Sequence, residues 1–108
     1  MKSLSLKFAL AGFLCGAIGD ALNHVALFFN DFLMPVKVAK CTNDAMGDSH
    51  QCMVAATHFK LLCDIIPVSH TIYSVGDLGI FLGLMIFTPA LAIYLYSVAK
   101  NLRFWYHI

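Results

Sequence analysis

The stretch LGIFLGLMIFTPALAIYLYSV, from Leu78 to Val98, contains no charged residue. A helix of about 20 apolar residues, rising ~1.5 Å per residue, crosses the ~30 Å hydrocarbon core of a bilayer. A soluble chain of 108 residues has too small a core to bury such a helix on all sides. The stretch therefore predicts a transmembrane helix, which we place at about 75–99.

A second apolar stretch runs from Phe8 to Leu33 and is also long enough to span. It follows Lys2 and Lys7 as in a signal peptide, but no small-x-small cleavage site comes after it, so we expect the helix to be retained. The chain is 60% hydrophobic and 12% charged, whereas soluble domains have roughly 45–50% and about 25%. These features predict an all-α integral membrane protein with a single membrane domain over residues 1–108.

The expected order is a transmembrane helix at about 8–33, an extracytoplasmic loop at about 34–74 and a transmembrane helix at about 75–99. Outside the two spans the charges near the chain ends are all basic: Lys2, Lys7, Lys100 and Arg103. Lys and Arg beside short tails mark the cytoplasmic face of a membrane. We therefore expect both termini in the cytoplasm and the loop on the periplasmic or extracellular side. A net charge of +1 without a basic cluster gives no support for a nucleic-acid partner.

The loop contains Cys41 and Cys52, which are either bridged or two free thiols. A disulfide between them would stabilise the loop by ~3 kcal/mol on the chain-entropy relation, and an extracytoplasmic location would permit it. Apolar residues repeat at helical spacing from Cys52 to Ile66, and Pro67 follows. This pattern predicts a short amphipathic helix at the membrane surface.

Glycine pairs at GxxxG spacing occur in both spans, at Gly12 and Gly16 and at Gly79 and Gly83, and Gly19 extends the first stripe. Lipid provides no hydrophobic drive for helices to associate, so close backbone contact along small residues holds them together. We expect these glycines to pack the two spans against each other and against a partner chain.

Polar side chains interrupt the first apolar run at Asp20, Asn23 and His24. Ionisable groups at membrane depth cost a few kcal/mol and face protein or water. Asp20 and His24 are spaced i, i+4 and are able to pair. These residues form either a satisfied polar patch between packed helices or a functional site. Asp77, three residues after Ser74, is expected to cap the second helix.

Several short motifs lie in a definite order along the chain: MPV (Met34–Val36) after Asn23 and Asn30, then DIIP (Asp64–Pro67), then YSVGDLGIFLG (Tyr73–Gly83). This combination resembles a bacterial family of small multi-pass membrane proteins described only as a domain of unknown function. The resemblance covers roughly residues 16–83. It implies a location in the bacterial inner membrane and supplies no activity.

The segment around Asp77 is similar, more weakly, to the start of the last helix of signal peptidase II, the lipoprotein-processing aspartyl protease. That resemblance implies Asp77 as one catalytic aspartate. Asn23 stands where the second is expected, and Asp20 lies about one turn away. Because such a protease needs two carboxylates that share a proton, the chain departs from this family at Asn23, and it also lacks the family's four-helix architecture. If the chain is an enzyme, Asp77 and Asp20 are its catalytic residues.

Candidate ligands for zinc or copper occur in the loop without a standard ligand spacing: Cys41, Asp48, His50, Cys52 and His58, with His70 beyond them. We expect no metal, no cofactor and no enzymatic activity. The sequence favours an accessory or assembly subunit of a larger membrane complex, with the lipid bilayer and other membrane-protein subunits as its partners. The alternatives are a reduced aspartyl hydrolase related to signal peptidase II and a metal- or cofactor-holding membrane subunit.

Overall fold

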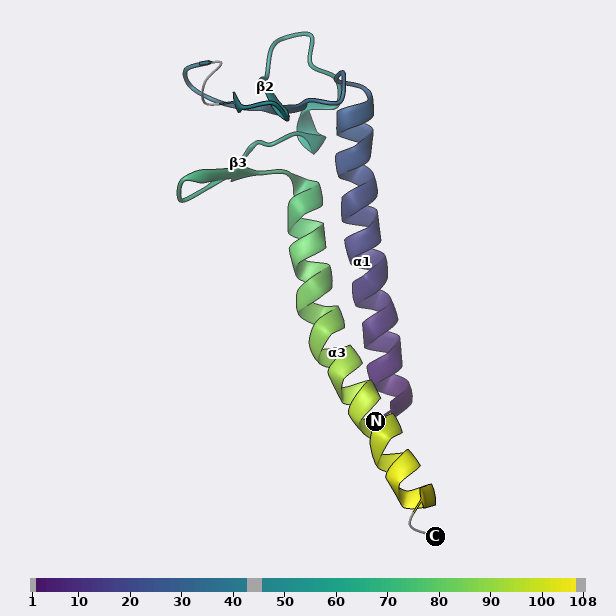
Figure 1. The fold of residues 1–108 in the computed structure, drawn as a ribbon. Coiled ribbons are helices and arrows are strands. Elements are labelled where there is room, and N and C mark those ends of the chain that lie inside the picture. Colours follow the sequence, from purple (N-terminus) through teal and green to yellow (C-terminus); the bar gives the residue numbers. More distant parts are fainter. Residues whose placement is uncertain (1, 43–45, 107–108) are drawn as a thin grey trace. The chain divides into compact units, whose positions relative to one another are not determined.

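The computed structural model describes residues 2–42 and 46–106, with side chains over 3–42 and 46–103. The elements follow in the order α1 (Lys2–Phe28), β1 (Met34–Val36), β2 (His50–Cys52), the 3-10 turn η1 (Lys60–Leu62), β3 (Ile66–Val68), β4 (Thr71–Tyr73) and α3 (Val75–Tyr106) (Figure 1). The chain divides into two compact units. One contains residues 1–17 and 80–108, and the other contains residues 18–79.

Two long apolar helices are present, as predicted. Mean hydropathy reaches 1.4 in the segment Ser3–Phe28 and 2.2 in Val75–Arg103, and both segments are long enough to cross a bilayer. The first helix ends at Phe28, earlier than expected. The chain leaves the helix because Asp31 and Phe32 adopt left-handed backbone angles, and the Phe32 N–H donates to the Leu27 carbonyl at 2.8 Å.

Four short strands contradict the expected all-α class. In the unit of residues 18–79, β1 pairs in parallel with β2, and β3 pairs in antiparallel with β4. A bridge between Val36 and Asp64 adds a partner on the other side of β1. The strands are only three residues long and irregular in burial, so they carry no alternation that a sequence pattern could reveal.

The predicted helix from Cys52 to Ile66 is wrong, because long-range hydrogen bonds override the local periodicity. The buried Asn30 side chain donates to the His58 carbonyl at 2.8 Å and accepts from the His58 N–H at 3.0 Å. The next residue, Phe59, has a left-handed backbone (φ 52°), and only the short turn η1 follows. A helix through this segment would need the same backbone groups for its own ladder.

The core of the second unit is small and lies where α1 ends. Its buried members are Ala26, Met34 and Cys63. A disulfide joins Cys41 to Cys52, with 5.9 Å between their Cα atoms. This bond ties the segment after β1 to the end of β2, so a covalent link supplements a core too small to order the loop alone.

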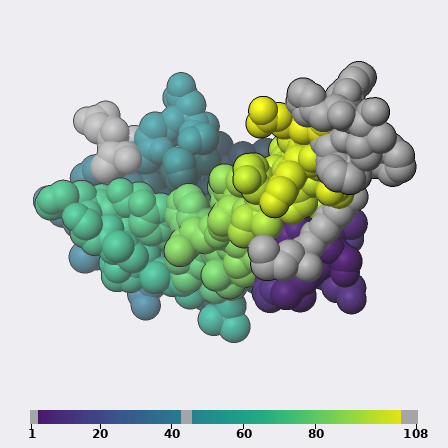
Figure 2. All heavy atoms as spheres, turned by 90° about the horizontal axis from the view of Figure 1, so that it is seen from below, coloured from purple at the N-terminus to yellow at the C-terminus, as the bar shows by residue number. Residues whose placement is uncertain are grey.

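In the unit of residues 1–17 and 80–108, α1 and α3 approach at backbone contact. A Cβ on Gly83 would lie 2.5 Å from the Gly16 nitrogen and 2.6 Å from the Gly12 carbonyl oxygen, and a Cβ on Gly12 would lie 2.6 Å from the Phe87 nitrogen. Figure 2 shows the purple N-terminal segment against the yellow-green part of α3. A Cβ on Gly16 would meet no atom within 4 Å, so this glycine differs from its neighbours.

A similar approach occurs in the unit of residues 18–79. A Cβ on Gly76 would lie 2.5 Å from the Gly19 carbonyl oxygen and would collide with the Asn23 side chain. Gly19 is buried and Gly79 is half-buried. Close packing through small residues is therefore present in both units.

We predict opposite effects for alanine at two glycines of the same unit. Gly83→Ala should lower the free energy of unfolding by about 1–3 kcal/mol, because its methyl group would overlap backbone atoms that cannot swing aside. Gly16→Ala should be neutral or stabilising by up to about 1 kcal/mol, because its methyl group enters open space and alanine favours the helix. Unfolding in detergent micelles measures both. Equal destabilisation by the two variants would contradict this packing.

Candidate functional site

A polar junction forms where α3 begins, within the unit of residues 18–79. The Ser74 N–H donates to Asp77 Oδ2 at 3.0 Å, and the Asp77 N–H donates to Ser74 Oγ at 3.0 Å. This reciprocal arrangement is a capping box, which satisfies two backbone N–H groups at the helix start. The predicted capping role of Asp77 is confirmed.

Asn23 of α1 completes the junction. Its Nδ2 donates to Asp77 Oδ1 at 2.9 Å, and its Oδ1 accepts from the Ser74 hydroxyl at 2.6 Å. Both Nδ2 and Oδ1 of Asn23 are therefore hydrogen-bonded, and both carboxylate oxygens of Asp77 accept a hydrogen bond. The junction thus positions α1 against the start of α3, and its donors and acceptors are used for structure.

Asp20 and His24 do not join this junction. Their side chains are 64% and 70% exposed, and His24 Nδ1 lies 3.5 Å from Asp20 Oδ1 and 2.8 Å from the Asp20 carbonyl oxygen. The predicted i, i+4 pairing is therefore present. The two residues form an exposed pair on α1, whereas Asn23 is packed against α3.

A pocket of about 300 Å³ lies over a buried carboxyl group in the same unit. The Asp64 side chain is only 8% exposed, and its Oδ2 lies 3.6 Å from His50 Nε2. His70 and Thr71 add polar groups, and the remaining walls are Val36, Val38, Met46 and Ile72. Apolar walls with a few convergent polar groups are typical of small-molecule sites.

The backbone explains how this acid comes to be buried. The Asp64 N–H donates to the Pro35 carbonyl at 3.0 Å, and its carbonyl accepts from the Lys37 N–H at 2.9 Å. Asp64 thus continues the sheet beside β1, and His50 is the first residue of β2. Burial raises the pKa of the Asp64 carboxyl to about 6; the nearby Asp77 adds to the rise and His50 opposes it.

Sequence reasoning missed Asp64 as a site residue. The surface helix predicted from Cys52 to Ile66 contains Asp64, and on such a helix an acid would be solvated. The available signal was its position between apolar residues in LLCDII, because a lone acid in such a run is either paired or perturbed. His70 and Thr71 carried no such signal, because only the turn between β3 and β4 brings them to the pocket.

The structure does not bring the candidate metal ligands of the loop together in one site. Cys41 and Cys52 are joined in the disulfide, so neither is available as a thiolate ligand. Asp48 and His58 are exposed. Over residues 3–42 and 46–103, whose side chains the structure describes, no three His, Cys, Asp or Glu side chains are grouped so that they could hold a metal ion.

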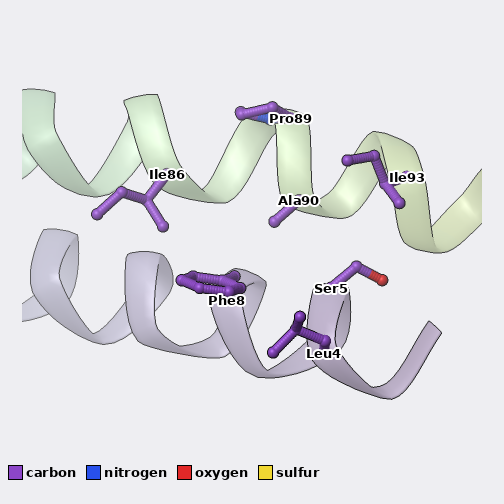
Figure 3. A pocket seen from close by; sticks show the side chains of 7 residues that line it. All are labelled: Leu4, Ser5, Phe8, Ile86, Pro89, Ala90 and Ile93. Carbon is purple, nitrogen blue, oxygen red and sulfur yellow. The ribbon is translucent and has the colours of Figure 1, made fainter. Parts of the chain in front are cut away.

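The unit of residues 1–17 and 80–108 contains a larger groove of about 400 Å³ (Figure 3). Its lining consists of Leu4, Ser5, Phe8, Ile86, Pro89, Ala90 and Ile93. Ile86 and Ala90 point from α3 toward the α1 side. One hydroxyl is the only polar side-chain group in this lining, so the groove suits an apolar chain and offers no acid or base for catalysis.

We predict that the polar junction tolerates an exchange of the Asn and Asp side chains between positions 23 and 77. Asn23→Asp places a second carboxylate against Asp77 and should lower the free energy of unfolding by about 2–4 kcal/mol. Adding Asp77→Asn restores one donor between the two side chains, so the double variant should regain most of the loss. Unfolding of the four proteins in micelles gives the coupling energy. Additive losses would show that the two residues do not interact.

We predict that stability falls as pH rises from about 4 to about 7. The folded chain holds the Asp64 proton more tightly than the unfolded chain, whose pKa is near 3.8, so stability is greatest below pH 4 and is lost as pH rises through about 6. The full effect is on the order of 2–3 kcal/mol.

Unfolding at several pH values, compared between the wild type and Asp64→Asn, isolates this contribution from other carboxyl groups. The titratable groups near Asp64 include His50, His70, Asp77 and the adjacent Cys63. Because His50 favours the ionised acid, His50→Gln should steepen the decline. An unchanged pH dependence in Asp64→Asn would contradict the assignment.

Comparison with known protein families gives a match. A family model described as "Family of unknown function (DUF5317)" matches residues 1–88. Comparison with curated proteins and with solved structures gave no match. The match covers α1, all four strands and the first part of α3, so this protein is a member of the family of unknown function DUF5317.

Proposed function

We propose that this protein is an integral membrane protein of the bacterial inner membrane that acts as an accessory or assembly subunit of a larger membrane complex. Both termini are cytoplasmic in this proposal, and residues 34–74 lie on the outer side. The role is non-catalytic and needs no cofactor. Its partners are the lipid bilayer and other membrane-protein subunits.

Exposed apolar side chains support a bilayer location. Only 22% of the most apolar window of α1 and 11% of that of α3 is buried within the chain. Large side chains such as Phe13, Leu14 and Met85 are 61%, 58% and 73% exposed. In water, a contiguous apolar surface of this kind would drive aggregation, whereas hydrocarbon solvates it.

The distribution of charge and the disulfide support the orientation. Lys7, Lys100 and Arg103 lie toward the chain ends and the segment between the helices contains the Cys41–Cys52 bond. Basic residues favour the cytoplasmic side, and disulfides persist on the oxidising side of a bacterial inner membrane.

The exposed Asp20–His24 pair is the observation that carries the subunit role. Asp20 lies about 12 Å along the helix axis from Phe28, so it is well inside the candidate span. A carboxylate facing lipid at such a depth costs up to about 3 kcal/mol, and such groups face protein or a water-filled cavity. Within the unit of residues 18–79, no other described segment covers this pair, and we infer that a neighbouring subunit satisfies it.

The hydrogen bond of His24 indicates what that neighbour supplies. A carbonyl oxygen only accepts, so the 2.8 Å contact with the Asp20 main chain places a proton on His24 Nδ1. In the neutral imidazole, Nε2 is then an acceptor. Together with the Asp20 carboxylate it matches a donor from another helix, such as a Ser, Asn, Lys or Arg side chain.

The alternative of a reduced aspartyl hydrolase has no comparable observation in its favour. Both oxygens of Asp77 accept hydrogen bonds from the junction, and the Asp20 side chain pairs with His24. A shared proton between two carboxylates requires them in direct contact.

Complex formation in the native membrane tests the subunit role. The double variant Asp20→Asn/His24→Phe should reduce the share of the chain in a larger complex at least tenfold, on native gels of mildly solubilised membranes, because it removes the carboxylate charge and the imidazole acceptor together. Ala21→Leu is the matched control. It changes an exposed residue at the same depth, about 100° around the helix, and should leave the complex intact.

Two results would overturn the proposal. One is a wild-type chain that migrates alone or only with copies of itself. The other is a double variant that is retained in the complex as well as the control. Quantitative mass spectrometry of the gel bands identifies the companion proteins in either case.

A further inference from the structure

The carboxyl group of Asp64 lies in the pocket with little to satisfy it. Its nearest partner, His50 Nε2, is 3.6 Å away, which is beyond hydrogen-bond distance. Over the described part of the chain, its side-chain oxygens take part in no hydrogen bond. Among the described residues no buried side-chain oxygen lacks a hydrogen-bond partner, so the Asp64 oxygens reach the open pocket, where a donor of a ligand can meet them.

We propose that this pocket binds a small organic cation, a primary ammonium carried on a short apolar body. An ammonium group has three N–H donors and no acceptor. The pocket offers the Asp64 carboxylate, the Thr71 hydroxyl and the His70 imidazole as acceptors. The apolar body would lie against Val36, Val38 and Ile72.

The size and charge of the pocket restrict the ligand further. A volume of about 300 Å³ holds on the order of ten non-hydrogen atoms, so only a small molecule fits. The one formal charge buried in the lining is negative, which disfavours an anion. A metal ion is not supported, because no three His, Cys, Asp or Glu side chains of the described residues are grouped so that they could hold one. The inference does not depend on the proposed subunit role.

Binding of n-butylammonium chloride to the full chain in detergent micelles tests the proposal. Carboxyl and imidazole NMR signals are followed at pH 7.5, with n-butanol as the neutral analogue and sodium chloride at equal ionic strength. The ammonium should shift the Asp64 and His70 signals saturably, with a Kd roughly in the millimolar range. Butanol and sodium should produce no saturable shift.

Three variants distinguish the carboxylate from other causes. Asp64→Asn should weaken binding at least tenfold, whereas Asp48→Asn, which removes an exposed acid outside the pocket, should leave it unchanged. His50→Leu should strengthen binding several-fold, because leucine has no N–H group to compete for the Asp64 carboxylate.

Equal saturation by butanol, or equal affinity in the wild type and Asp64→Asn, would overturn the proposal. If Asp64→Asn fails to fold, the direction of the His50→Leu effect decides: weaker or unchanged binding in that variant also overturns the proposal. None of these readouts depends on a partner subunit, so this result and that of the native-gel experiment are separate.

Discussion

Backbone contact between α1 and α3 is the constraint on which the rest of the structure depends. In each unit a glycine of α3 meets the backbone of α1: Gly83 at Gly12 and Gly16, and Gly76 at Gly19. Dispersion and short hydrogen bonds act only at such distances, and two helices in lipid have no hydrophobic drive to replace them. The capping box at Ser74 and its contact with Asn23 then determine where α3 begins relative to the end of α1 within the second unit.

The long helices could be predicted from the sequence because their signal is local and strong. An uncharged run as long as Leu78–Val98 has few other conformations available, and Ser74 with Asp77 marks the start of the helix by side-chain chemistry alone. The disulfide was one of two open possibilities, since two cysteines in one loop do not specify a bond. The structure contains it.

The strands and the pocket could not be predicted, because contacts distant in sequence create them. Asn30 holds His58 across the loop, and Pro35 and Lys37 bind the backbone of Asp64. These contacts break the helical periodicity of Cys52–Ile66 and bury an acid that a surface helix would leave in solvent. The three polar residues of the first apolar run have different surroundings: Asn23 packs against α3, while Asp20 and His24 are exposed. The sequence could not predict this difference, because it depends on the side of α1 that α3 contacts.

The buried thiol of Cys63 bears on the oxidation of this chain. Cys63 is fully buried, and burial first and the neighbouring Asp64 second raise the pKa of its thiol. Thiol–disulfide exchange requires a thiolate that can reach a sulfur atom of the bond. Once the second unit has folded, Cys63 is therefore a poor nucleophile toward the Cys41–Cys52 bond, and the native pairing is protected against reshuffling by the same packing that surrounds the acid.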